Sequence, residues 1–417
     1  MFTFLLEAAF WCSVAAILYV YLGYPLLLAA LALRAKPRTI KPPPTLQTVT
    51  VIIAAFNEEG VIADKLVNTL QLDYPKNKLQ IIVGSDGSTD ATDEIVRRYA
   101  DRGVELIRVE GRQGKTAVQN AAVQAARGEV LVFSDANAMY APGAIKRLVH
   151  WFSDGEVGCV EGRRLDFALD TDCTGGTELL FHDYESFIKD LESRTYSCVG
   201  ATGPIYAVRK ELYVPLAHDL ISDLIEPIMI MARHRKVQLF DRDATSREAV
   251  ELLADKAYRR KVRLMTRALY SLRQANRSTG ILNPFRFGWY SIQLLSHKVL
   301  RYLIPVFLLL ALLSSGLLAD RLLYGIAMFV QLGLYSAALI GAMQQHRGRP
   351  AAPFRLAHYF VLANIAALAA LIAVAQGRNV LRWDTGRGRA PLKGSNRTRY
   401  RRWARRSQDG EAGTKKS

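Results

Sequence analysis

The sequence predicts an α/β domain built on a mostly parallel sheet, with membrane-spanning helices before and after it in the chain. Three observations lead to this fold class. Short apolar segments alternate with helix-like segments between residues 49 and 134, one uncharged run precedes them, and three apolar runs follow near the C-terminus. Half of the 417 residues are hydrophobic and 22% are charged, which excludes a disordered or fibrous chain.

Residues 8–33 form a run without any charge. As a helix this run would be about 39 Å long, which exceeds the ~30 Å hydrocarbon core of a bilayer. A cleaved signal peptide fits less well, because the run has no basic start and is longer than a typical apolar h-region. Four basic residues follow it, namely Arg34, Lys36, Arg38 and Lys41. The positive-inside rule then places the next region in the cytoplasm.

Three further apolar runs, at residues 302–319, 322–343 and 356–375, each have about the length of a spanning helix. Residues 376–417 hold 13 Lys and Arg against 3 Asp and Glu, out of a formal net charge of +17. Four spans would place this basic tail outside, against the positive-inside rule. One C-terminal run is therefore expected to be re-entrant or to lie flat. We expect a multi-pass protein of a cell membrane, of the bacterial inner-membrane type.

The basic tail contains a segment at 397–406 in which Arg alternates with Tyr and Trp. Taken alone, this pattern could bind nucleic acid. Next to a membrane, anionic lipid headgroups are the favoured partner, and no nucleic-acid partner is expected. The chain is thus expected to have five parts: a transmembrane helix with its basic flank at 1–41, a cytoplasmic α/β domain at 42–275, an interfacial segment at 276–301, transmembrane helices at 302–375 and a basic tail at 376–417.

The α/β domain is predicted from seven segments after the stiff Pro42-Pro43-Pro44 connector. The strands are expected at 49–55, 79–84, 105–109 and 130–134, and the helices at 57–70, 88–99 and 115–126. Continuously apolar strands indicate a parallel sheet that is covered on both faces. Functional groups should then gather at the carboxyl ends of the strands. No G-x-G-x-x-G motif follows the first strand, which argues against a nicotinamide or flavin enzyme.

Polar residues do follow the expected strands. Glu58 comes after the first strand, Asp86 after the second, and Asp135 with Asn137 after the fourth. Asp86 can accept a hydrogen bond from a nucleobase imide, and Asp135 with Asn137 can hold a divalent cation that bridges phosphates. Lys115 at a helix start adds a positive charge to backbone donors that favour an anion. A single residue of this kind is usually a loop or capping residue, whereas the ordered set indicates a nucleotide site.

In this ordered set the sequence resembles the family 2 inverting glycosyltransferases, which include the synthases of cellulose, hyaluronan and poly-N-acetylglucosamine. The matching segments are VTVIIAAFNEE (49–59), GSDGSTDAT (84–92), GKTAVQNAA (114–122), FSDAN (133–137), GATGPIYAVRK (200–210), SDLIEP (222–227), RKVRL (260–264) and SHKVLRY (296–302). The resemblance implies a GT-A fold that binds a nucleotide sugar, usually a uridine diphosphate (UDP) sugar, together with Mg²⁺ or Mn²⁺.

The resemblance also implies roles for individual residues. Glu58 and Asp86 would bind the uridine, Lys115 the diphosphate, and Asp135 the ribose or the metal. Asp223 matches the general base of the family. The acceptor site would be lined by Gly200, Thr202 and Gly203.

Inverting transfer needs such a base, because an acceptor hydroxyl must lose its proton as it attacks the anomeric carbon. Glu226, three residues after Asp223, is the second candidate for this role. Arg260 and Arg263 match the outer positions of the family's Q-x-x-R-W motif and suit a departing diphosphate. They belong to a basic stripe at helical spacing, and the alternative is an interfacial helix that touches anionic lipid.

The sequence departs from the family at several of these positions. Leu264 replaces the Trp of the Q-x-x-R-W motif, and Asn137 replaces the second Asp of a D-x-D motif. We expect a membrane-bound inverting glycosyltransferase that extends a β-linked polysaccharide. The alternative is non-processive transfer to a membrane lipid, which the missing Trp and the small number of spans favour. A nucleotide-sensing membrane protein without turnover is the remote alternative.

Overall fold

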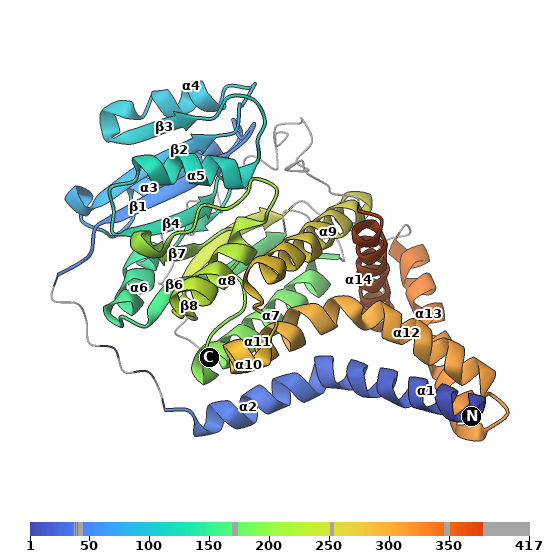
Figure 1. Cartoon of the computed structure of the whole chain (residues 1–417). Coiled ribbons are helices and arrows are strands. Elements are labelled where there is room, and N and C mark those ends of the chain that lie inside the picture. Colours follow the sequence, from blue (N-terminus) through green and yellow to red (C-terminus); the bar gives the residue numbers. More distant parts are fainter. Residues whose placement is uncertain are drawn as a thin grey trace, which may run out of the picture. The chain divides into compact units, whose positions relative to one another are not determined.

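The computed structural model describes residues 1–36, 38, 40, 45–168, 174–250, 254–345 and 351–377, and it forms two compact units. The helical unit comprises Met1–Ala35, Asp170–Thr195 and Leu252–Val380. The sheet unit comprises Lys36–Leu169 and Tyr196–Glu251, and residues 378–417 lie outside the described part of the chain. Each unit is considered by itself, and Figure 1 labels their elements.

The sheet unit contains eight strands within the described residues, in the order β3-β2-β1-β4-β7-β6-β8-β5. Their bounds are Val49–Ala55 (β1), Leu79–Ser85 (β2), Val104–Arg108 (β3), Val130–Asp135 (β4), Met139–Tyr140 (β5), Val157–Ala168 (β6), Tyr206–Arg209 (β7) and Val237–Val250 (β8). The strands β3, β2, β1 and β4 pair in parallel, as the sequence predicts. The other half is mixed, because β7 runs antiparallel to both of its neighbours and β5 runs antiparallel to β8.

Five α-helices of the sheet unit are described: Ile62–Leu70 (α3), Thr92–Arg97 (α4), Lys115–Ala125 (α5), Ala144–His150 (α6) and Ser222–His234 (α8). The core between sheet and helices is apolar, and the rings of Phe133 and Tyr206 stack within it at 4.9 Å between centroids. The first helix begins at Ile62, later than the predicted residue 57. A turn occupies the intervening residues and leaves Glu58 at the end of β1.

The register of the parallel strands brings their carboxyl ends to one edge of the sheet. Ala54 of β1 pairs with Gly84 of β2 on one side and with Asp135 of β4 on the other. The residues that follow these three strands therefore start from neighbouring positions (Figure 1). This register is what positions the candidate site.

Among its described residues, the helical unit contains four helices that are long and apolar enough to cross a membrane: Phe2–Arg34, Trp289–Leu317, Leu322–Gln344 and Ala352–Ala375. The first comprises α1 (Phe2–Leu18), a π-helical turn (Tyr19–Gly23) and α2 (Tyr24–Arg34), and the second comprises α11 (Trp289–Leu294), a π-helical turn (Leu295–Val299) and α12 (Leu300–Leu317). The others are α13 (Leu322–Gln345) and α14 (Ala352–Ala375), and the unit also holds α7 (Thr174–Thr195), α9 (Ala254–Thr279) and α10 (Pro284–Phe287). The four apolar runs of the sequence are thus helices.

The second apolar helix begins at Trp289, well before the predicted residue 302. Charged residues interrupt the apolar run before residue 302, so the sequence alone indicates a later start, and the membrane boundary itself stays a prediction. In the structure these charges are paired with α7: His297 lies between Glu185 and Glu192, at 3.0 and 2.9 Å. Lys298 and Arg301 also contact Glu185, at 2.8 and 2.6 Å. Pairing allows a charged segment to continue an apolar helix.

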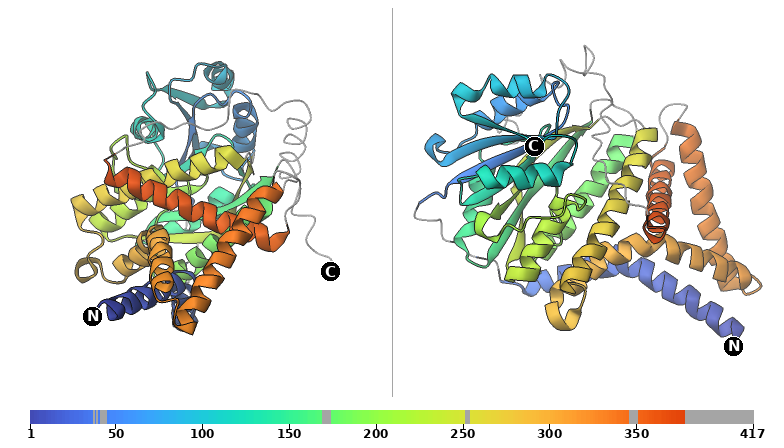
Figure 2. Two further views of the ribbon diagram at one scale, coloured as in Figure 1. Left: turned by 90° about the vertical axis from the view of Figure 1, so that its right-hand side faces the viewer. Right: turned by 45° about the horizontal axis from the view of Figure 1, so that its top comes forward.

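The helix α9 packs within the helical unit, beside α14 (Figure 2). Lys261 of α9 donates a hydrogen bond to the hydroxyl of Tyr359 of α14, at 3.0 Å. Among the residues before α9, the sheet unit extends to Glu251, and the domain boundary expected at residue 275 stays a prediction. That one C-terminal run lies flat or is re-entrant stays a prediction.

Candidate active site

The end of β4 carries the two residues expected to hold a metal ion. Asp135 is the last residue of β4, and the Ala138 amide donates to the Asp135 carbonyl at 3.2 Å, which closes a turn around Asn137. Asn137 is buried, and its Oδ1 atom has no hydrogen-bond partner among the described residues. An orphaned amide oxygen two residues after a carboxylate, on the same turn, fits Mg²⁺ or Mn²⁺, which take oxygen ligands.

These two residues supply only part of a coordination shell. Within the described ranges no cluster of three or more His, Cys, Asp or Glu could hold a metal ion. Sites that bind Mg²⁺ commonly combine one or two protein oxygens with substrate phosphates and water. The arrangement therefore fits a cation that arrives with a diphosphate.

Lys115, Asp135 and Asp223 converge at Gly203. The ammonium of Lys115, at the start of α5, lies 2.5 Å from Oδ1 of Asp135. A methyl group added at Gly203 would lie 2.7 Å from Nζ of Lys115, 2.8 Å from Oδ2 of Asp223 and 3.4 Å from Oδ2 of Asp135. Burial lowers the pKa of Lys115, but the carboxylates of Asp135 and Asp223 outweigh it and hold that pKa above its ordinary value. The structure thus brings together four predicted site residues.

Asp223 lies in the first turn of α8 and is tied to the predicted acceptor loop. Its carbonyl accepts from the Ala201 amide at 2.9 Å, and its Oδ1 accepts from the Leu224 amide at 3.0 Å. The second carboxylate oxygen is the one that faces Gly203. Asp223 is therefore held with one oxygen directed to the place where Lys115 and Asp135 meet.

Glu226, the second candidate base, has a different environment. It is 1% exposed, and its Oε1 accepts from the Val214 amide at 2.8 Å. Burial raises the pKa of Glu226 to about 8. A carboxyl group buried in this way is protonated at neutral pH and out of reach of an acceptor. The geometry therefore favours Asp223 over Glu226 as the base.

The predicted acceptor loop is held by two residues that the sequence analysis does not identify. Glu161 of β6 accepts from the Thr202 hydroxyl at 2.8 Å and from the Gln238 amide at 3.2 Å. Gln238 of β8 also donates to the Gly200 carbonyl, at 3.0 Å. Gly200 has φ +81°, and a Cβ there would meet Leu224 at 2.6 Å, so this position requires glycine.

A second pair missed from the sequence joins the same two strands. Arg164 of β6 lies 3.1 Å from the Glu248 carboxylate of β8, and both side chains are mostly buried. The Glu248 carboxylate also contributes to raising the pKa of Lys115, after the larger contributions of Asp135 and Asp223. In the sequence, β6 and β8 could have been predicted from the apolar segments VGCV (157–160) and VQLF (237–240), each of which is followed by charged residues.

Asp86 follows β2 and is fully buried. Its carboxylate accepts from the Gln113 amide at 2.8 Å and from the Gly114 amide at 3.0 Å. These bonds fix the turn that precedes Lys115. A carboxylate oxygen has two lone pairs, so Asp86 can also accept from a nucleobase. Binding of the base by Asp86 and by Glu58, which is also buried, stays a prediction.

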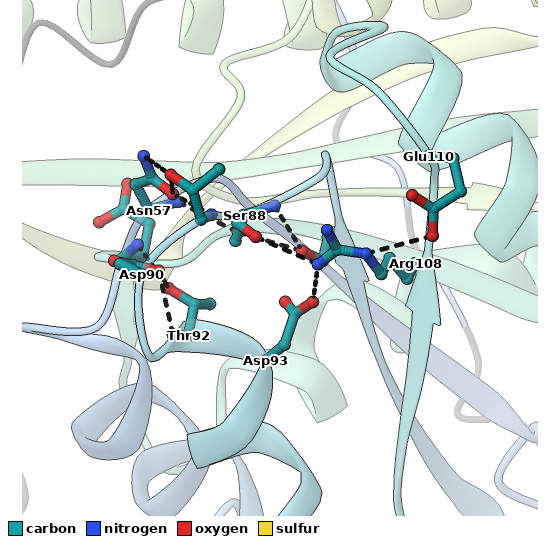
Figure 3. Close-up of polar contacts among 10 residues, drawn as sticks. Asn57, Ser88, Asp90, Thr92, Asp93, Arg108 and Glu110 are labelled. Carbon is teal, nitrogen blue, oxygen red and sulfur yellow. Dashed lines mark hydrogen bonds and ion pairs between the residues drawn. The ribbon is translucent and has the colours of Figure 1, made fainter.

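The loops after β1 and β2 are joined by side-chain contacts (Figure 3). Asn57 has φ 53°, a left-handed conformation that asparagine tolerates, and its Oδ1 accepts from the Thr89 amide at 2.8 Å. Arg108 donates to the Ser88 carbonyl at 3.1 Å and pairs with Asp93. The loop that carries Glu58 is thereby fixed to the loop that carries Asp86.

Arg260 and Arg263 lie on α9, in the helical unit. Their predicted contact with a diphosphate therefore stays a prediction, as does the alternative of a lipid contact. The basic tail at 378–417 lies outside the described residues, and so does its predicted lipid contact.

Comparisons with known proteins concern the domain that carries these residues. Residues 50–213 match the family described as "Glycosyl transferase family 2". Beta-monoglucosyldiacylglycerol synthase from Nostoc sp. is 30% identical over 124 residues, which cover 29% of this chain and 26% of the relative. Glycosyltransferase AglE from Haloferax volcanii is 31% identical over 183 residues, covering 43% of this chain and 59% of the relative. The matches thus span between about a quarter and three fifths of these relatives.

The structure is similar to that of the mannosyltransferase PcManGT from Pyrobaculum calidifontis, which was determined in complex with GDP-Man and Mn²⁺. The TM-score is 0.67 at 23% identity, with 89% of this chain and 99% of that chain covered. This likeness confirms the GT-A-like α/β fold that the sequence predicts.

Proposed function

Because residues 50–213 form a glycosyl transferase family 2 domain on a GT-A fold, we propose that the protein transfers a sugar from a nucleoside diphosphate donor, with inversion. The observation that carries this proposal is the convergence of Asp223, Lys115 and Asp135 at Gly203. It combines a carboxylate able to take a proton with a cation and a second carboxylate suited to a metal–diphosphate.

The reaction is a single displacement. The oxygen of an acceptor hydroxyl forms a bond to the anomeric carbon, the bond from that carbon to the diphosphate oxygen breaks, and its electron pair leaves with the diphosphate. The acceptor proton passes to Oδ2 of Asp223. Lys115 stabilises the negative charge that develops on the departing diphosphate. A base in this position typically contributes a factor of ~10²–10⁴ in rate.

Asp135 and Asn137 would hold the Mg²⁺ or Mn²⁺ ion. When bound, such an ion neutralises diphosphate charge and stabilises the leaving group. In the structure the ammonium of Lys115 contacts the Asp135 carboxylate, so a positive charge already occupies the neighbourhood of that carboxylate. A metal ion bound to Asp135 would leave Lys115 to pair with the diphosphate instead.

The donor base is proposed to be uracil or guanine. The sequence resemblance favours a UDP-sugar, while the structurally similar PcManGT was determined with GDP-Man. Asp86 could accept from the imide N–H of uracil and equally from the N–H groups of guanine. Both donor classes therefore belong in the test.

We propose a membrane lipid as the acceptor. Leu264 stands where polymerising members carry Trp and is 43% exposed, so no aromatic platform for a sugar is present at that position. Four candidate spans would enclose a narrow tunnel at most. The Nostoc relative is named for synthesis of a glucolipid. Extension of a β-linked polysaccharide, favoured by the resemblance between residues 200 and 302, is the second candidate.

The test is nucleotide release by membranes that contain the full-length protein. They receive UDP- and GDP-sugars one at a time with Mg²⁺ or Mn²⁺, and a chelator serves as the control. Release from one donor, lost with the chelator, is expected, and a radiolabelled sugar from it should appear in single-sugar lipid products. A long polymer would instead support the second candidate, extension of a β-linked polysaccharide. Tight nucleotide binding without release from any donor would contradict transfer and favour a sensor.

A further inference from the structure

Lys65 of α3 is a buried lysine beneath the candidate active site. Its side chain is 0% exposed, its ammonium donates to the Ala138 carbonyl at 2.5 Å, and it lies 3.9 Å from the centre of the Tyr140 ring. Burying an ammonium is costly unless specific contacts compensate for lost hydration. An apolar residue would fill the same space without that cost, so the contacts of the ammonium call for an explanation.

Lys65 contacts the end of the turn from Asp135 to Ala138, which is the turn proposed to hold the metal ion. Ala138 directly follows Asn137, and its own amide closes the turn on Asp135. Asn68, one turn further along α3, accepts from the Tyr140 amide at 2.8 Å and donates to the Tyr140 carbonyl at 3.0 Å. Lys65 and Asn68 thus bind the same short segment through its backbone.

Tyr140 extends this support to the predicted acceptor loop. Its hydroxyl lies 3.1 Å from the Phe133 carbonyl of β4 and 3.1 Å from the Pro204 carbonyl, one residue after Gly203. Its backbone pairs with Ser246 of β8. The contacts of Lys65 are therefore continuous with both the strand that ends in Asp135 and the loop that contains Gly203.

Two carboxylates act on the charge of Lys65. Burial lowers the pKa of Lys65 to about 7, and the carboxylates of Asp135 and Glu248 act in the opposite direction. The ammonium is thus close enough to Asp135 to interact with its charge, although its hydrogen bond is made to the neighbouring backbone.

We propose that Lys65 is a positioning residue that holds the turn from Asp135 to Ala138 through the Ala138 carbonyl, so that the oxygens of Asp135 and Asn137 face one metal ion. This inference rests on the proposed function, because it assumes a cation at these two residues. Groups that orient metal ligands in this way typically change metal affinity by 10- to 100-fold when they are replaced.

The experiment compares Mn²⁺ binding by full-length wild type, Lys65→Met, Lys65→Gln and Leu66→Ala in detergent. Loss of the free Mn²⁺ signal in electron paramagnetic resonance gives the affinity, in separate titrations with UDP and with GDP. Methionine keeps the length of the side chain without a donor, and glutamine restores a neutral donor. Leu66 is fully buried on the same helix and offers no hydrogen bond, so Leu66→Ala controls for lost packing.

We expect Lys65→Met to bind Mn²⁺ 10- to 100-fold more weakly. Lys65→Gln should recover part of this loss, and Leu66→Ala should keep wild-type affinity. Wild-type affinity in Lys65→Met, or equal losses in the methionine and glutamine variants, would overturn the role of the hydrogen bond. If wild type binds no Mn²⁺ with either nucleotide, the proposed metal-dependent function fails as well.

A second measurement needs neither metal nor nucleotide. Hydrogen–deuterium exchange of the segment 136–140 reports directly on the turn. We expect exchange of these amides to be faster in Lys65→Met than in wild type and Leu66→Ala. Unchanged exchange would show that the turn holds without Lys65 and would refute the inference independently of the reaction.

Discussion

Gly203→Ala is the substitution that most directly tests whether the three charged groups share one reacting space. The added methyl would lie 2.7 Å from Nζ of Lys115 and 2.8 Å from Oδ2 of Asp223. Nonbonded heavy atoms favour about 3.5 Å or more, so each group must move by roughly 0.7 Å or more. Both atoms end flexible side chains, so they can move without unfolding the protein.

The expected result is a large loss of rate with little loss of stability. Misplacing a reacting group by about 1 Å can reduce the rate about 10²-fold. We therefore expect kcat/KM for nucleotide release to fall about 10²-fold in Gly203→Ala, while the midpoint of thermal unfolding stays close to that of wild type. Gly143→Ala is the matched control, because a methyl there has no atom within 4 Å. It should keep the wild-type rate.

One outcome would refute this reasoning. If Gly203→Ala released nucleotide at the wild-type rate and unfolded at the same temperature, the methyl would not have disturbed the chemistry. Lys115, Asp135 and Asp223 would then not act on a common substrate at Gly203.

Three further predictions concern neighbouring residues. Asn137→Ala should weaken Mn²⁺ binding about tenfold in the presence of nucleotide, because it removes the orphaned oxygen, and calorimetry measures this. Asp86→Asn should weaken nucleotide binding without unfolding the protein. An NH₂ group would replace one of the two carboxylate oxygens that accept from the Gly114 amide and that can accept from a nucleobase. Fluorescence titration measures the nucleotide affinity. Glu226→Gln should change the pH dependence of unfolding. The pKa of Glu226 is about 8 in the folded protein against an ordinary 4.5, so wild-type stability falls between those pH values and the variant's advantage in unfolding midpoint should be larger at pH 8 than at pH 5.

Much of the parallel half of the sheet unit, from β3 to β4, could be predicted from the sequence. The segment VTVIIAA at 49–55 is continuously apolar, and all seven residues of β1 are buried in the structure. Such a strand must be covered on both faces, which requires a parallel sheet with helices on either side. The polar residues at the carboxyl ends of these strands, Asp135 as the last residue of β4 and Asp86 directly after β2, then had to lie at one edge.

The other half carries weaker local signals. β7 has only four residues, and β6 continues through charged residues such as Glu161 and Arg164 that pair across the sheet. Their burial depends on partners far away in the sequence, as in the bond from Gln238 to Glu161. The hydrophobic periodicity and the composition of a sequence do not reveal which residues pair across strands.

The same limit explains the missed site residues. Asp135 and Asp223 could be identified because they stand in motifs at the ends of elements. Lys65 lies inside a helix, where a lysine ordinarily faces water, and nothing in its neighbours indicates burial. Only the three-dimensional contact with the Ala138 carbonyl reveals that it lies against the turn from Asp135 to Ala138.

The most direct test of the central claim is a comparison of wild type with Asp223→Asn. Nucleotide release from the active donor is measured together with the dissociation constant of the nucleotide. Asparagine keeps the shape of the side chain but cannot take the acceptor proton, so release should fall by ~10²–10⁴ while nucleotide affinity stays unchanged. Release that continues at the wild-type rate would contradict the assignment of Asp223 as the base, and with it the mechanism proposed for this site.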